Sequence, residues 1–267
     1  MRKSIIFLFV FLIVVGSGAS GIGEGSTNPE NNKKMILPYA DFAINFCNFP
    51  YAWTVSRGRG VKVGLLYKDA PVFDPDMEAG HGTWMARDLV KVAPGVKIMP
   101  VRFCGNGIFG DADLYIKGIE YAAANGADVI SISHQPIPRN KQKEVDSAVA
   151  KAAEKNVVLV YIHYRGERDE VVVSNPVEFA AYDRNNRKVY VIGTNFIDDS
   201  SFPFTWGFSQ TAPIVSGVIA MMKEVNPKLT PLEINHILLK SVNKTPDGYP
   251  VLDAVKAVKK AKAVGAQ

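Results

Sequence analysis

Ser209 and His81 are the two residues of this sequence whose surroundings best suit nucleophilic catalysis. Ser209 lies in WGFSQTAPIVSG, residues 206–217, directly before an apolar run that predicts a helix. A serine at a helix start presents its hydroxyl and its N–H at the positive end of the helix dipole, which favours an oxyanion formed by attack. Pro213 fits the first turn, where N–H groups have no intrahelical partner. An ordinary N-cap serine is the alternative.

His81 lies between two glycines in AGHGTWMARDL, and the apolar periodicity that follows predicts a helix. It therefore stands at a loop-to-helix junction, where glycine lets the backbone approach a neighbour closely. Histidines in such settings are more often structural than catalytic, and this holds for each of the four taken alone: His81, His134, His163 and His236. No pair of them has the spacing of zinc ligands, and the chain has no CxxC motif, so no metal site is predicted.

Alternating strands and helices are expected to position these residues. Apolar runs rich in β-branched residues predict buried strands at 61–67, 96–103, 127–133, 157–164 and 188–196. Amphipathic stretches predict helices at 111–126, 143–156 and 252–264, and a capping box at Thr230 predicts another that ends at Ser241. This alternation indicates an α/β fold with a doubly wound, mainly parallel sheet and helices on both faces.

The composition suits one globular domain of α/β type, with 267 residues of which 47% are hydrophobic and 21% charged. The formal net charge is +5, and much of the excess lies in the C-terminal AVKKAKAV. The rest of the chain is nearly balanced and lacks the clustered basic footprint of a nucleic-acid-binding protein. No nucleic-acid partner is therefore expected.

The N-terminus has the order of a secretory signal. Arg2 and Lys3 precede an apolar run over 5–15 and small residues over 16–20. We expect a signal peptide over 1–19, a flexible leader over 20–45 and a folded domain over 46–267, in a protein that is secreted, periplasmic or at the cell surface. An uncleaved N-terminal anchor is the alternative. In an exported chain Cys47 and Cys104 can form a disulfide or remain two buried thiols, and their spacing does not decide between these.

Five stretches, in the right order along the chain, resemble the subtilisin-like serine proteases. GHGTWMA resembles the histidine motif of that family and GFSQTAPIVSG its serine motif. The stretch 51–67 resembles the entry to its first strand, 116–133 its helix and substrate-binding strand, and 248–258 the entry to its C-terminal helix. The resemblance implies a subtilisin-type fold, a peptide or protein as substrate or ligand, His81 as general base and Ser209 as nucleophile.

The sequence departs from the family pattern at the triad aspartate, whose position falls on Tyr67. Asp69 follows two residues later, and two strand residues displace a side chain by ~6.6 Å, so it is a candidate for a displaced acid. Asp74 and Asp76 are further candidates. Losing the triad aspartate costs about 10⁴ in turnover in enzymes with this triad.

A second departure concerns the oxyanion hole, where Arg165 falls at the position of the family's asparagine. Losing one oxyanion donor costs about 10² to 10³ in turnover. Ser133 and His134 fall in the strand that pairs with substrate. The resemblance implies no organic cofactor. Calcium is common in the family, but no acidic loop of this sequence specifies a site.

These features predict an exported serine peptidase with weak or altered proteolysis. The alternative is a non-catalytic pseudo-protease that binds peptides or a protein partner. If the signal stays attached, a membrane-tethered structural protein is a third interpretation.

Overall fold

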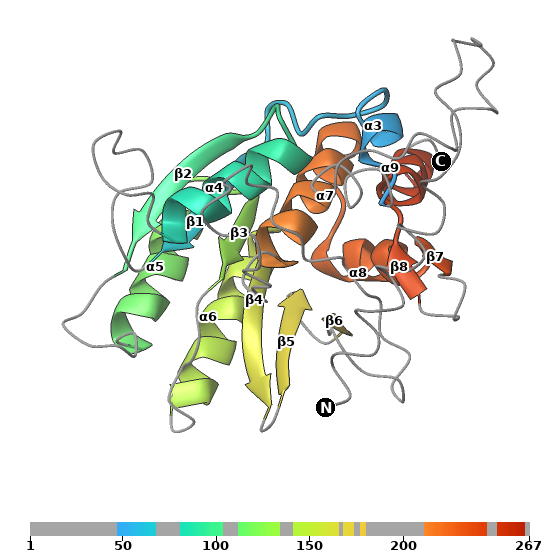
Figure 1. Cartoon of the computed structure of the whole chain (residues 1–267). Helices are drawn as coiled ribbons and strands as arrows, with labels where there is room; N and C mark the ends of the chain where they lie inside the picture. The colour runs from blue at the N-terminus through green and yellow to red at the C-terminus, as the bar shows by residue number, and fades with distance from the viewer. Residues whose placement is uncertain are drawn as a thin grey trace, which may run out of the picture.

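One large sheet organises the part of the chain that the computed structural model describes (Figure 1). That part comprises residues 47–67, 81–103, 112–133, 141–165, 168–173, 177–179, 211–244 and 250–264. Within it the strands of the sheet follow the order β2-β1-β3-β4-β5-β6, and β7 pairs separately with β8. The strands are β1 (Lys62–Tyr67), β2 (Lys97–Arg102), β3 (Val129–Ile132), β4 (Val158–Arg165), β5 (Arg168–Val173), β6 (Val177–Phe179), β7 (Val242–Lys244) and β8 (Pro250–Leu252).

The first four strands of the sheet are parallel. Strand β1 pairs in parallel with β2 and β3, and β3 pairs in parallel with β4. Strands β5 and β6 then extend the sheet in antiparallel fashion. The strands predicted over 61–67, 96–103, 127–133 and 157–164 are confirmed, whereas β5 and β6 were not predicted. The strand predicted over 188–196 lies outside the described residues.

Helices cover both faces of the sheet, as predicted. Helices α5 and α6 pack on one face, α4 and α7 pack on the other, and α9 lies against α7 (Figure 1). The helices are α3 (Phe49–Ala52), α4 (His81–Val92), α5 (Ala112–Ala124), α6 (Gln142–Glu154), α7 (Thr211–Val225), α8 (Pro231–Leu239) and α9 (Ala254–Val264).

The hydrophobic core is divided by the sheet, because successive strand residues point to opposite faces. In β3, Val129 belongs to the cluster that packs around α7 and α9, whereas its neighbour Ile130 belongs to the cluster around α5 and α6. Both residues are fully buried. The apolar run of β3 therefore reflects a strand covered on both sides.

Pro100 lies inside β2 without ending the strand. It pairs with Leu65 of β1, and β2 is an edge strand of the described sheet. A proline is tolerated there because its missing N–H would otherwise point away from the neighbouring strand.

Helix α8 begins with the capping box that the sequence predicted. The Thr230 hydroxyl accepts a hydrogen bond from the Glu233 backbone N–H at 3.3 Å, and the Glu233 carboxylate accepts one from the Thr230 N–H at 2.8 Å. Pro231 follows in the first turn. Such reciprocal bonds satisfy two donors that a helix start would otherwise leave open.

Two expectations about export receive no structural test. The predicted signal peptide and leader lie outside the described residues, and so does Cys104, while Cys47 is buried beside α3 and α9. Both alternatives for Cys47 and Cys104, a disulfide or two buried thiols, therefore stay open. Among the helices over the described ranges, none is long and apolar enough to cross a membrane.

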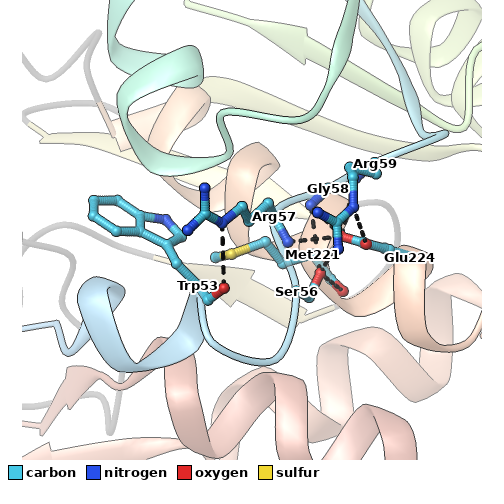
Figure 2. Close-up of polar contacts among 7 residues, drawn as sticks. All are labelled: Trp53, Ser56, Arg57, Gly58, Arg59, Met221 and Glu224. Atoms are coloured by element: carbon cyan, nitrogen blue, oxygen red, sulfur yellow. Dashed lines mark hydrogen bonds and ion pairs between the residues drawn. The ribbon is translucent and has the colours of Figure 1, made fainter.

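A partly buried carboxylate, that of Glu224, fixes the C-terminal end of α7 to the segment before β1 (Figure 2). Oε2 of Glu224 accepts hydrogen bonds from the backbone N–H groups of Arg57, Gly58 and Arg59 at 2.7, 2.6 and 2.9 Å. It also accepts one from the Ser56 hydroxyl at 2.7 Å. One carboxylate therefore satisfies the donors of a whole turn.

This cradle stabilises the ionised form of Glu224. Burial alone would raise the pKa of its carboxyl, but the hydrogen bonds from Ser56 and from the backbone of residues 57–59 outweigh burial and lower the pKa. A lowered folded-state pKa means that the stabilisation is complete at neutral pH and is lost as the pH falls through the carboxyl range.

We expect Glu224→Gln to reduce the free energy of unfolding by about 2 kcal/mol near pH 7, because hydrogen bonds to a charged acceptor each contribute about 1.5–3 kcal/mol. The loss should shrink as the pH falls and the wild-type carboxylate takes up a proton, because its pKa is lowered. Urea titration at pH 7 and at a series of acidic pH values measures it. Glu154→Gln, an exposed position of α6, is the matched control. Equal losses in both variants at pH 7 would contradict the role of the cradle.

Candidate active site

The Glu224 cradle also sets the direction of α7. It holds the C-terminal end of α7 beside residues 56–59, which lie just before β1 begins. A helix of 15 residues is about 22 Å long, so its first residue, Thr211, lies towards the edge where the parallel strands end. Ser209 itself lies outside the described residues, two positions before Thr211.

Helix α4 begins at His81 and returns across the same face of the sheet from the end of β1. It packs closely on α7, because a Cβ at Gly217 would lie only 2.5 Å from Cγ1 of Val92. The glycine that ends the stretch WGFSQTAPIVSG is therefore required for the contact between the two helices. That contact fixes the helix that His81 begins relative to the helix that Ser209 precedes.

Tyr67 lies directly against the first turn of α4. A Cβ added at Gly82 would lie 2.9 Å from Cγ of Tyr67 and 3.0 Å from its Cδ2, so only a glycine fits beside the ring. Tyr67 is 8% exposed and ends β1. The residue at the position expected for the triad aspartate is thus a buried phenol packed on the neighbour of His81.

The imidazole of His81 stands at this same edge of the sheet. The residue is partly buried, and its Nδ1 atom is inaccessible to solvent. In a serine–histidine pair this nitrogen faces the group that orients the ring, while Nε2 faces the nucleophile.

The predicted substrate-binding residue Ser133 follows the last residue of β3. Because Leu66 pairs with Ile132, Tyr67 and Ser133 come next at the carboxyl ends of adjacent parallel strands. Ser133 is 4% exposed. The structure therefore brings Tyr67, Gly82 and Ser133 to one edge, whereas His134 and Asp69 lie outside the described residues.

Arg165 lies within β4 rather than in a loop after it. It is the last residue of that strand and pairs with Arg168 of β5 across an antiparallel ladder. The sequence interpretation ended the strand at residue 164, so the strand is longer than predicted. The oxyanion role of Arg165 stays a prediction.

Asp88 is a buried carboxyl of α4 that the sequence interpretation missed. The residue is fully buried, and neither carboxyl oxygen has a hydrogen-bond partner within the described ranges. Desolvation raises the pKa of Asp88 to about 8, partly opposed by the positive charge of Lys91. The sequence does contain a pattern that indicates this burial, because Asp88 falls at helical spacing from the apolar residues Met85 and Val92.

Asp88 is too far along α4 to orient the His81 ring. The two residues are seven positions apart in the helix, which is about 10.5 Å along the helix axis. Asp88 is therefore not the missing acid of a triad. Nor do the described residues identify a calcium site, because no three His, Cys, Asp or Glu side chains among them form a group that could hold a metal ion.

Comparison with known sequences finds one matching family. The sequence model of the subtilase family matches residues 72–163, a segment that contains His81 and ends within β4. An intracellular serine protease of Paenibacillus polymyxa is 23% identical over 240 residues, which cover 68% of this chain and 72% of that protein. Thermitase of Thermoactinomyces vulgaris is 24% identical over 221 residues, which cover 65% of this chain and 78% of thermitase.

Comparison with solved structures shows the same fold. The prenylagaramide maturation protease PagA superimposes with a TM-score of 0.60 at 19% identity, covering 81% of this chain and 99% of PagA. MycP1 from Mycobacterium smegmatis superimposes with a TM-score of 0.59 at 17% identity, covering 83% and 86%. The predicted subtilisin-like α/β fold is confirmed.

Proposed function

The chain is a member of the subtilase family, and from this premise we propose that it is an exported serine peptidase with Ser209 as nucleophile and His81 as general base. Family membership implies a peptide or protein substrate. We further propose that Tyr67 occupies the position of the triad aspartate, so that proteolysis is weak or altered.

The contact between Tyr67 and Gly82 carries this proposal. The ring lies 2.9 Å from the position of a Cβ at residue 82, immediately after His81 in the chain. A phenol can hold an imidazole by a hydrogen bond, but it is neutral near pH 7 and does not stabilise the imidazolium that forms when the base accepts the serine proton. Turnover is thereby reduced while the nucleophile–base pair remains.

The proposed mechanism has two stages, acylation of Ser209 and hydrolysis of the acyl-enzyme. His81 accepts the Ser209 proton as Oγ attacks the scissile carbonyl, and the N–H groups at the start of α7 face the developing oxyanion. The protonated His81 then donates to the leaving amine. A water molecule then attacks the acyl group as His81 accepts its proton. His81 returns a proton to Ser209 as the acyl group leaves as a carboxylic acid. Arg165 is proposed to stand at the position of the family's oxyanion asparagine, which it replaces imperfectly, and Asp69 is proposed as a displaced acid.

The same observation favours the second candidate, a pseudo-protease that binds peptides or a protein partner without cleaving them. A protein that does not cleave its ligand forms no imidazolium at His81, so it has no need of a charged residue at the aspartate position. Ser133, directly after β3, would then still lie beside an extended ligand that pairs with this segment of the chain.

A fluorophosphonate probe distinguishes the two candidates. We expect it to label the wild type, because an activated Ser209 oxygen attacks phosphorus, fluoride leaves and His81 accepts the hydroxyl proton. Labelling should disappear in Ser209→Ala and fall at least tenfold in His81→Ala, whereas Ser147→Ala, an exposed serine of α6, should leave it unchanged. Absence of labelling under conditions that label an active subtilisin favours the binding protein.

The intact mass of the labelled chain, recovered from its native host, also shows at which residue the mature chain begins. Export with cleavage predicts loss of Met1 to about Ala19. A retained Met1 on membrane-bound material would instead favour the tethered form.

A further inference from the structure

Helix α9 exposes lysines and no acidic residue. Its buried side packs against α7 and α8. Its exposed lysines are Lys256, Lys259, Lys260 and Lys262. Residues three and four apart are neighbours on a helix surface, so these four ammonium groups form one continuous strip along α9.

Two neighbouring elements extend this strip. Nζ of Lys256 donates to the Val242 carbonyl at 2.8 Å, which brings it beside β7 and the exposed Lys244. Nζ of Lys260 donates to the carbonyl of Lys240, at the end of α8. We call the surface formed by Lys240, Lys244, Lys256, Lys259, Lys260 and Lys262 the basic face. Figure 1 shows α8, β7, β8 and α9 gathered at one end of the molecule, away from α5 and α6.

The other exposed helices carry mixed charge. Helix α5 exposes Asp113, Lys117 and Glu120, and α6 alternates lysines with Glu144, Asp146 and Glu154. On the elements that form the basic face, the acidic residues among those described are Glu233, whose carboxylate closes the α8 capping box, and the buried Asp253, which accepts the Lys256 backbone N–H. A surface of one sign produces a field that interspersed charges would cancel.

We propose that the basic face docks this protein onto a bilayer that contains anionic phospholipid. Lysine presents a compact charge on a flexible stem, which suits diffuse attraction to many headgroups. The described basic face has no arginine to bind a base edge bidentately and no aromatic ring on which a base could stack, so a bilayer is favoured over a nucleic acid. Val264 ends the strip, 46% exposed, and can contact the interface beside the lysines.

Vesicle sedimentation with the full chain tests this proposal. Binding to vesicles of phosphatidylglycerol and phosphatidylcholine should exceed binding to pure phosphatidylcholine at least tenfold and should fall steeply with salt. The double variant Lys259→Gln/Lys262→Gln removes two exposed lysines of α9, and it should weaken binding ~25-fold, since each lysine near an anionic surface contributes about fivefold. Lys143→Gln/Lys151→Gln, on α6, removes the same charge and should change binding less than twofold.

The outcomes separate the alternatives. If the protein instead inserted through the apolar segment 5–15, vesicle binding would be equal for both lipid mixtures and for both double variants. That result would overturn the proposal. Equal loss in the two double variants would show a net-charge effect, which also overturns it. Salt-sensitive binding of a duplex oligonucleotide that depends on Lys259 and Lys262, without selective vesicle binding, would assign the face to nucleic acid instead.

Discussion

Replacing Tyr67 with aspartate is expected to raise Ser209-dependent hydrolysis of activated peptide esters by about 10²- to 10⁴-fold. The upper bound is the factor that enzymes with this triad lose when the aspartate becomes uncharged. The lower part of the range allows for a carboxylate that is not ideally placed against His81. Esters are the appropriate first substrate because their leaving group needs less help from an acid than an amine does.

The contact with Gly82 determines how this substitution acts. Aspartate is much smaller than tyrosine, so it removes the ring that packs on α4 and leaves a cavity. Truncating a buried aromatic residue costs about 3–5 kcal/mol, so the assay should follow a check of folding by circular dichroism at low temperature. Tyr67→Asn is the matched control, since it leaves nearly the same cavity without the charge. A gain in the aspartate variant that the asparagine variant lacks isolates the carboxylate.

Two further variants locate the source of any gain. The gain should vanish when Ser209→Ala is added, because attack then has no nucleophile. Adding Arg165→Asn should raise the rate further if the oxyanion position has been aligned correctly. A wild type that cleaves well and is unaffected by Tyr67→Asp would show that a carboxylate such as Asp69 already orients His81. If no combination yields Ser209-dependent turnover, the binding protein is favoured.

Local signals explain which elements the sequence could predict. The apolar run over 61–67 became β1 because it fills both faces of the sheet, and Thr230 began α8 because its capping box needs only residues within one turn. Strands β5 and β6 were missed for the opposite reason. Residues 168–170 are all charged, and their strand conformation depends on antiparallel pairing with β4.

The site was predicted only in part for a similar reason. The resemblance assigned His81, Ser209 and Tyr67, but it could not show that the Tyr67 ring lies on Gly82 rather than pointing away from α4. The cradle of Glu224 joins residues about 165 positions apart, so no local pattern indicates it. Asp88 is intermediate, because helical spacing places it on the buried side of α4, while its lack of a partner is a property of the packed structure.

We expect Asp88→Asn to raise the free energy of unfolding by about 2–4 kcal/mol near pH 7. Burial raises the pKa of this carboxyl to about 8 in the folded protein, from an ordinary value of 3.8. At pH 7 the folded chain therefore binds a proton that the unfolded chain has released, and each pH unit between the two values costs about 1.36 kcal/mol. Asparagine is a neutral side chain of the same shape and avoids this cost.

The pH dependence gives the sharper measurement. Because the folded-state pKa of Asp88 is raised, its destabilising effect is absent below about pH 4, grows as the pH rises and is complete above about pH 8. Unfolding by urea across this range should show the wild type losing stability relative to Asp88→Asn with a slope that approaches one proton, and the two proteins should converge near pH 4. Asp146→Asn, an exposed position of α6, should change neither the slope nor the stability at pH 7 by more than about 0.5 kcal/mol. Parallel pH profiles for the wild type and Asp88→Asn would show that Asp88 is ionised in the folded protein and that a cation such as Lys91 compensates its burial. The charge would then be a stabilising partner of α4, and Asp88→Asn would destabilise the helix that begins at His81.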